Sequence, residues 1–153
     1  MDKQKLIIGL VGVGLIISAA LAGPVTAAQK GQDTSGPSYV EQKMAECKKK
    51  STSIPMAKVQ EMLVEGGWLF IDVRTETEFK KGRIPGAINI PRGKLEFIME
   101  SKVPDKGTKI LVYCKKGGRA CLALCTILDM GYSGAIAMEE GFAQWAKADY
   151  PVE

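Results

Sequence analysis

The 153-residue chain contains no histidine. Without an imidazole group it has no Ser-His-Asp or Cys-His catalytic arrangement, and no zinc site that depends on a histidine ligand. A general base would have to be a carboxylate, a lysine or a tyrosine. Chemistry that starts from an already ionised thiolate needs no base at all. The missing histidine therefore directs attention to the four cysteines.

The chain also lacks a basic stripe interleaved with aromatic residues. Its net charge is only +4 and its aromatic content 7%, and its lysines are scattered apart from short runs such as 48–50 and 115–116. This pattern argues against a nucleic-acid partner. The cysteine spacings do not suit a zinc site. A content of 46% hydrophobic and 25% charged residues fits one globular domain with a sizeable core.

The N-terminal 28 residues are typical of a targeting segment. Lys3 and Lys5 precede an apolar run over residues 6–21, and small residues at 26–28, or alternatively 20–22, suit signal peptidase. We predict that residues 1–28 are a signal peptide, with a retained membrane anchor through residues 6–22 as the alternative. No cysteine directly follows the run, which argues against a lipoprotein. Either reading predicts a periplasmic or otherwise exported domain.

Residues 29–52 are predicted to form a linker and a short leader helix. The stretch 29–37 is polar and rich in glycine and serine. Ser38 and Glu41 then have the spacing of a capping box, which predicts a helix through Lys49. A second helix is predicted over residues 53–65, with Pro55 in its first turn. The domain proper is placed at residues 53–153.

Strands and helices alternate through the rest of the chain. Strands are predicted at residues 68–73, 87–90, 109–113 and 134–138, with helical patterns between them and at the end. This alternation predicts an α/β fold, a parallel sheet flanked by helices. Ligands bind beyond the carboxyl ends of such strands. One strand delivers Asp72 and Arg74 to that edge, and another delivers Cys114.

The segment after Cys114 has the composition of an anion cradle. Gly117 and Gly118 let the backbone curl with its N–H groups inward, and a helix starts directly after them. Lys115 and Lys116 raise the local positive potential, while Arg119 can fix the loop or face a bound anion. A cysteine at the mouth of this cradle favours the thiolate. It could attack phosphate or arsenate, or instead the sulfane sulfur of an anion such as thiosulfate.

Four dispersed segments within residues 53–153 resemble the rhodanese (sulfurtransferase) family. Asp72-Val73-Arg74 with Glu78-Phe79 resembles the D-V-R and E-F motif, and residues 82–91 resemble G-H-I-P-G-A-x-N-I-P. Residues 112–119 resemble the active-site loop. Gly141-Phe142 with Trp145, followed by Tyr150-Pro151-Val152, resembles the family's ending. The four residues between Cys114 and Arg119 are also similar to sulfurtransferases, whereas the related phosphatases have one more.

The resemblance implies a rhodanese-like fold and a thiosulfate sulfurtransferase that works through a persulfide on Cys114. The small anionic donor would be bound by the loop residues Lys115, Lys116, Gly117, Gly118, Arg119 and Ala120, and the sulfur would pass to cyanide or a thiol acceptor. No metal or organic cofactor is implied. Two alternatives stay open: a persulfide carrier or docking module that does not turn over, and an enzyme acting on phosphate or arsenate.

Three positions depart from the family pattern. Arg83 stands where histidine is usual, either as a cation that assists the donor or as a surface charge. Ala120 replaces a serine or threonine whose hydroxyl could hydrogen-bond the cysteine sulfur. Glu140 replaces a glycine and is expected to affect only the loop geometry. Asp72 and Arg74 are expected to be supporting residues, with Arg74 paired to Asp72 or Glu78.

The remaining cysteines leave several pairings open. Cys121 and Cys125 are four residues apart on the predicted helix and therefore share a face. A disulfide from Cys47 to either of them would pin the leader helix to the domain, and an exported chain permits such a bond. Cys121 could instead resolve a Cys114 persulfide, or these side chains could simply fill the core.

Overall fold

The computed structural model describes residues 36–153 of the chain, so the predicted signal segment at 1–28 lies outside the described residues. No helix within 36–153 is long and apolar enough to span a membrane. The elements, in chain order, are α1 (Tyr39–Lys50), β1 (Ser53–Ile54), α2 (Met56–Glu65), β2 (Leu69–Asp72), α3 (Glu76–Lys80), β3 (Ile88–Asn89), η1 (Arg92–Lys94), α4 (Leu95–Lys102), β4 (Ile110–Tyr113), α5 (Gly118–Asp129), β5 (Ala135–Met138) and α6 (Phe142–Lys147).

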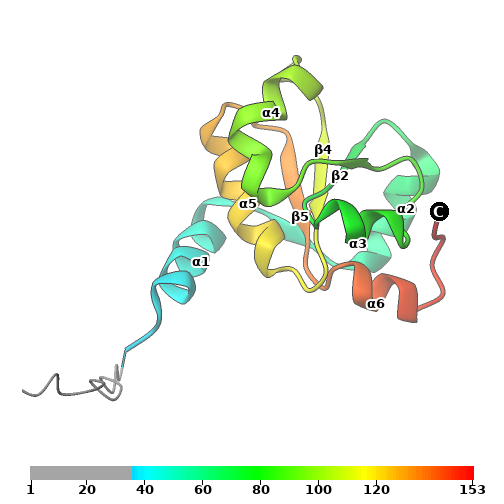
Figure 1. Ribbon diagram of the computed structural model, residues 1–153, viewed down its shortest axis with the longest axis horizontal. Helices are drawn as coiled ribbons and strands as arrows, with labels where there is room; N and C mark the ends of the chain where they lie inside the picture. Colours follow the sequence, from blue (N-terminus) through cyan, green and yellow to red (C-terminus); the bar gives the residue numbers. More distant parts are fainter. Residues whose placement is uncertain (1–35) are drawn as a thin grey trace, which may run out of the picture. The chain divides into compact units, whose positions relative to one another are not determined.

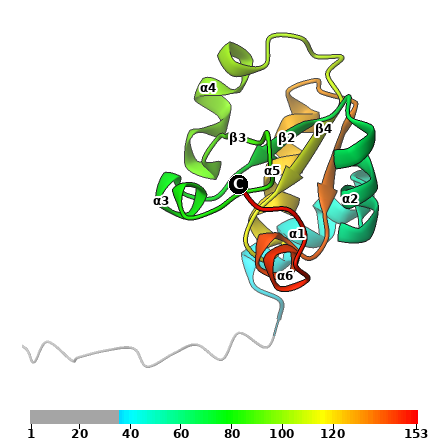
Figure 2. The same cartoon turned by 90° about the vertical axis from the view of Figure 1, so that its right-hand side faces the viewer.

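The strands form one sheet in the order β1-β5-β4-β2-β3, and every neighbouring pair is parallel. β4 lies at the centre of the sheet, and helices cover both faces (Figures 1 and 2). The predicted α/β architecture is confirmed. Because the strands are parallel, their carboxyl ends meet at one edge, which is where β2 and β4 deliver the candidate site residues.

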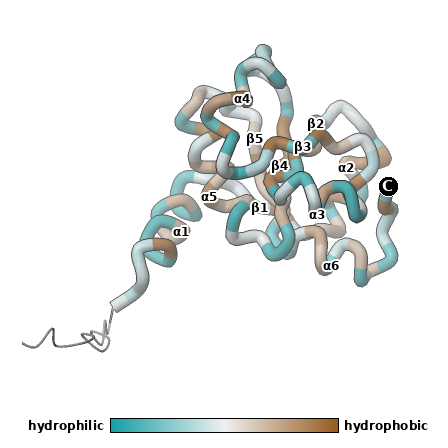
Figure 3. Tube along the Cα trace, in the orientation of Figure 1, coloured by the Kyte–Doolittle hydropathy of each residue, from teal (hydrophilic) through white to brown (hydrophobic). Residues whose placement is uncertain are grey.

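Each face of the sheet packs against its own set of helices. On one face, Val112 of β4 packs with Leu95 of α4 and Leu124 of α5. On the other face, Leu111 packs with Val59 of α2 and Trp145 of α6. Successive β4 residues point to opposite faces, and both faces are covered, which explains why the strand is a continuous apolar run. Figure 3 shows this hydrophobic centre beneath more polar helices.

Helix α1 packs on the outer side of α5. It begins as its capping box predicts: the Ser38 hydroxyl accepts from the Glu41 amide, and the Glu41 carboxylate accepts from the Ser38 amide. A disulfide joins Cys47 of α1 to Cys125 of α5 across a Cα–Cα distance of 5.6 Å. Of the open pairings, the structure therefore has Cys47 with Cys125, and Cys114 and Cys121 are free.

The helix predicted over residues 53–65 is wrong in its first three residues. Ser53 and Ile54 instead form the edge strand β1, which pairs with Ala137 and Met138 of β5. The helix begins at Met56, and Pro55 is its N-cap in an extended conformation. The physical reason is local, because a residue that precedes proline is pushed out of the helical region. The strand then gains hydrogen bonds from β5 that no sequence pattern displays.

Candidate active site

The site is built on the paired ends of β2 and β4. Asp72 lies opposite Tyr113 in the parallel register, and the amide of Val73 donates to the carbonyl of Tyr113 at 3.0 Å. Cys114 is the next residue, and only 1% of its surface is exposed. Burial raises the pKa of the neighbouring Tyr113 hydroxyl far above its ordinary value. The phenol therefore stays neutral, which removes this tyrosine as a base near Cys114.

Helix α6 fixes the start of the loop that follows Cys114. The amide of Phe142 donates to the carbonyl of Cys114 at 2.7 Å, and the amide of Ala143 donates to the carbonyl of Lys115 at 3.1 Å. The C=O and N–H groups of a trans peptide point in opposite directions. With those two carbonyls turned to α6, the amides of Lys115 and Lys116 point away from it, as an anion cradle requires.

The close approach of α6 depends on a glycine. Gly141 has φ +87°, and a Cβ on it would lie 2.7 Å from three backbone atoms of the Cys114–Lys116 segment. Gly117 has φ +84°, and a Cβ there would collide with the carbonyl oxygen of Glu139. Only glycine meets both the backbone and the space requirement at these two positions.

The amides of residues 115–120 donate to no protein oxygen in residues 36–153; the first such bond after Cys114 runs from Cys121 to the carbonyl of Gly117, at 2.9 Å. Several of these donors belong to the first turn of α5, where the helix dipole adds positive potential. The arrangement suits an anion held above a buried sulfur atom.

Asp72 and Arg74 form a buried ion pair beneath the loop. Asp72 is fully buried and Arg74 is 4% exposed. The Arg74 guanidinium donates to both Asp72 oxygens, at 2.6–3.0 Å, and to the carbonyl of Gly82 at 2.6 Å. It also lies over the ring of Phe142, 4.0 Å from the centroid. Arg74 thus positions α6, the helix that holds the Cys114 carbonyl. Its partner, Asp72, is one of the two acids that the sequence offered.

The other acid, Glu78 of α3, pairs with Arg119 of the loop. Arg119 donates to both carboxylate oxygens, at 2.8 and 2.9 Å. This bidentate contact lowers the pKa of Glu78 to about 2 and raises that of Arg119. The sequence allowed Arg119 either to fix the loop or to face a bound anion. In the structure its guanidinium is held by Glu78, which fixes the loop. The sequence offered Glu78 only as one of two possible partners of Arg74. Its pairing with Arg119 was not predicted, because the two residues lie 41 positions apart.

The other cations differ in their surroundings. Arg83 pairs with Glu153, and its guanidinium lies 4.8 Å from the Phe79 ring centroid. These contacts join the C-terminal residues to the domain. The guanidinium of Arg83 is therefore engaged in a structural contact. Lys115 and Lys116 are exposed loop residues, and neither forms a salt bridge within residues 36–153. Of the cations predicted for the site, these two remain available to an anionic ligand.

A cavity of about 440 Å³ lies beside the loop, on the side of α1. Its wall includes Lys116, Gly117 and Gly118 of the loop, Lys48 of α1 and the free Cys121 of α5. Cys114 does not line it. The volume falls in the range of small-molecule sites. Ala120, fully buried behind the loop, contributes no hydroxyl to its surroundings.

Two supporting residues were not predicted as such. Gly141 was noted only as part of a motif, yet it permits the contact between α6 and the loop. Glu140 does more than shape its loop, because its carboxylate accepts from the amide of Met56 at 2.9 Å and so caps α2. Pro55, the N-cap residue of that helix, offers no side-chain acceptor. The signal in the sequence for the capping role of Glu140 is that this acid replaces the glycine that the family usually has before Gly141.

Residues 56–148 match the Rhodanese-like domain family, and the chain belongs to that family. It is 31% identical over 120 residues to the chloroplastic thiosulfate sulfurtransferase 16 of Arabidopsis thaliana, covering 72% of this chain and 99% of that protein. Among solved structures, the human single-domain sulfurtransferase TSTD1 superposes with a TM-score of 0.57 at 25% identity, over 63% of this chain and 96% of the human one.

A further solved structure comes from Rhodopseudomonas palustris CGA009. It has a TM-score of 0.70 and 26% identity, and it covers 80% of this chain and all of that one. It is described as a protein of unknown function and possible tyrosine phosphatase. The descriptions of the similar proteins thus name sulfurtransferases and, in this one case, a possible phosphatase.

Proposed function

We propose that this chain is an exported sulfurtransferase that takes sulfane sulfur from thiosulfate or a similar donor and passes it on through a Cys114 persulfide. The observation that carries the proposal is the position of Cys114. Its sulfur is buried at the end of the central strand, under a loop whose six amides have no protein acceptor in residues 36–153. The names of the similar sulfurtransferases from Arabidopsis and human support the same activity.

In the proposed reaction, the Cys114 thiolate attacks the outer sulfur of thiosulfate. A bond forms between the two sulfur atoms, the bond to the sulfonate sulfur breaks, and sulfite leaves with the electron pair. The amides of residues 115–120 and the α5 dipole stabilise the persulfide anion. Lys115 and Lys116 attract the dianionic donor. Cyanide or an acceptor thiolate then attacks the terminal sulfur and regenerates the Cys114 thiolate.

Export is the second part of the proposal. The apolar run at residues 6–21 supports it, and so does the disulfide between Cys47 and Cys125, since such bonds persist in oxidising compartments.

The loop length distinguishes this function from an oxyanion enzyme. Four residues separate Cys114 from Arg119, a spacing similar to that of sulfurtransferases, whereas the related phosphatases have one residue more and a wider cradle for a tetrahedral oxyanion. A phosphatase also needs an acid for its leaving group. Glu78, an acid whose side chain reaches the loop, is engaged by Arg119, and its pKa of about 2 keeps it ionised. It is therefore a poor proton donor at neutral pH.

Persulfide formation is tested by intact mass after incubation with thiosulfate, with and without a reductant. We expect one reducible sulfur atom on the wild type and on Cys121→Ser, which removes the other free thiol, and none on Cys114→Ser. A wild type without the adduct, or a Cys114→Ser protein that retains it, would contradict the proposal. Multiple turnovers with cyanide distinguish an enzyme from a carrier, and hydrolysis of a small aryl phosphate would favour the oxyanion alternative.

A further inference from the structure

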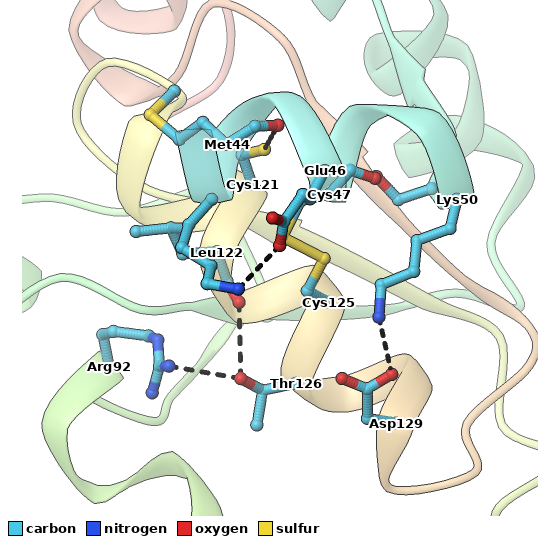
Figure 4. Close-up of a disulfide and its surroundings, with 12 residues drawn as sticks. Met44, Glu46, Cys47, Lys50, Arg92, Cys121, Leu122, Cys125, Thr126 and Asp129 are labelled. Carbon is cyan, nitrogen blue, oxygen red and sulfur yellow. Dashed lines mark hydrogen bonds and ion pairs between the residues drawn. A yellow bond between two sulfur atoms is a disulfide. The ribbon is translucent and has the colours of Figure 1, made fainter. Parts of the chain in front are cut away.

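Three of the four cysteines lie together on the side of the domain covered by α1. Cys47, Cys121 and Cys125 form one buried cluster, with Met44 and Leu122 packed against it. Cys47 and Cys125 are bonded, whereas Cys121 is a free thiol one turn earlier on α5. Figure 4 shows the Cys121 sulfur beside α1, where it donates to the carbonyl of Met44 at 3.8 Å. A free thiol is therefore packed against a disulfide.

The cluster is reached by two separate cavities. Cys121 lines the cavity of about 440 Å³ beside the Cys114 loop. Cys47 and Cys125 line a second cavity of about 320 Å³, between α1 and α5, together with Tyr39 and Leu122. The three cysteines thus separate a cavity that contains a thiol from one that contains a disulfide. Neither cavity is lined by Cys114.

We infer that Cys47, Cys121 and Cys125 form a thiol–disulfide exchange centre that moves the free thiol from one cavity to the other. The Cys121 thiolate attacks the sulfur of Cys47. A Cys47–Cys121 bond forms, the Cys47–Cys125 bond breaks, and Cys125 leaves as a thiolate with the electron pair. The proton lost by Cys121 returns to Cys125 through solvent, so there is no net oxidation or reduction.

Helix geometry selects Cys47 as the sulfur that is attacked. Attack on Cys125 would require a disulfide between residues four apart on one helix. Their Cβ atoms lie about 5–6 Å apart in a regular helix, whereas a disulfide needs about 3.5–4.5 Å. Cys47 lies on the opposite helix, and its bond to Cys125 spans a Cα–Cα distance of 5.6 Å, within the range of disulfides. The exchange therefore keeps α1 covalently attached in both forms. Because Cys121 faces Met44, one turn before Cys47, α1 shifts along α5 when the bond changes.

The surroundings of Cys121 make the exchange slow at neutral pH. Burial raises the pKa of its thiol, and Lys48 opposes part of that rise. The other charged groups around its cavity are Lys116 and Glu139. After the exchange, Cys125 lies in the cavity between α1 and α5, where its thiolate can attack an external disulfide. A mixed disulfide forms there and one half of the external molecule leaves as a thiolate. The centre thus takes small disulfide molecules.

The exchange is tested in a Cys114→Ser background, which removes the remaining thiol and makes the result independent of sulfur transfer. The protein is incubated with oxidised glutathione at mildly alkaline pH, and adducts are mapped by peptide mass without reduction. We expect glutathione on Cys125 as well as on Cys121. The matched controls add Cys121→Ser or Cys121→Ala, and both should lose the Cys125 adduct completely while keeping the Cys47–Cys125 bond.

Two results would overturn the inference. One is an adduct confined to Cys121 in the Cys114→Ser protein, because the thiol would then never reach Cys125. The other is an adduct on Cys125 that persists in both Cys121 variants, because the external disulfide would then react without the internal thiol. Using two replacements at position 121 separates the chemistry from any effect that one of them has on folding.

Discussion

Replacing Gly141 with alanine tests whether α6 holds the loop in its working shape. Gly141 has φ +87° and ψ 173°, a region that is essentially restricted to glycine and costs other residues about 1–3 kcal/mol. The new Cβ would also lie 2.7 Å from the carbonyl oxygen of Cys114 and from two further backbone atoms of the loop. Overpacking of this kind costs about 1–3 kcal/mol. The total loss of folding stability is thus roughly 2–6 kcal/mol.

We expect Gly141→Ala to impair persulfide formation as well as stability, because the clash lies in the loop that follows Cys114. Relief requires α6 and the loop to separate, which weakens the bonds from the Phe142 and Ala143 amides to the Cys114 and Lys115 carbonyls. The loop amides then lose their common orientation. We expect Gly141→Ala to form less persulfide with thiosulfate, as measured by intact mass, and to unfold at a lower urea concentration.

Gly131→Ala is the matched control. Gly131 also has a positive φ, +94°, but a Cβ there would meet no atom within 4 Å. This variant carries the backbone penalty alone, about 1–2 kcal/mol, and should keep the persulfide yield of the wild type. If the two variants lose equal stability and Gly141→Ala forms as much persulfide as the wild type, the proposed role of α6 is refuted.

Three further predictions concern ion pairs. Glu78→Gln should destabilise the protein by about 1 kcal/mol at pH 7, because the pair with Arg119 is partly exposed and screened by solvent. The Glu78 pKa is lowered from 4.5 to about 2, so the stabilisation is present above pH 4.5 and is lost as the pH falls toward 2. Urea unfolding of both proteins across that range checks this; a gap that stays constant would contradict it. Asp72→Asn should cost about 3–5 kcal/mol, because it leaves the buried Arg74 without a counter-charge. Glu153→Gln, in an exposed pair with Arg83, should cost at most about 1 kcal/mol in the same measurement.

The class of the fold could be predicted because its signals are local. Alternating strand and helix patterns require a parallel sheet, and the run before Cys114 is apolar at every position because β4 is covered on both faces. The same reasoning placed Asp72, Arg74 and Cys114 at one edge of the sheet. The edge strand β1 was missed, since two residues carry no periodicity and are held by a partner strand far along the chain.

The contacts that shape the site could not be predicted from the sequence in the same way. Whether Glu78 pairs with Arg74 or with Arg119 depends on where α3 lies relative to the loop. The role of Gly141 depends on how closely α6 approaches the Cys114 carbonyl. Both are distances between elements that are far apart in the sequence, and charge and composition do not determine them.

The cysteines show most clearly what the sequence determines by itself and what depends on the tertiary structure. The sequence alone determined that Cys114 follows a buried strand and opens a glycine-rich loop, because strand, loop and helix are contiguous there. It also placed Cys121 and Cys125 on one face of a helix, four residues apart. Only the tertiary structure decided which of them bonds to Cys47, because that depends on the position of α1 along α5. A shift of one helical turn would have reversed the choice.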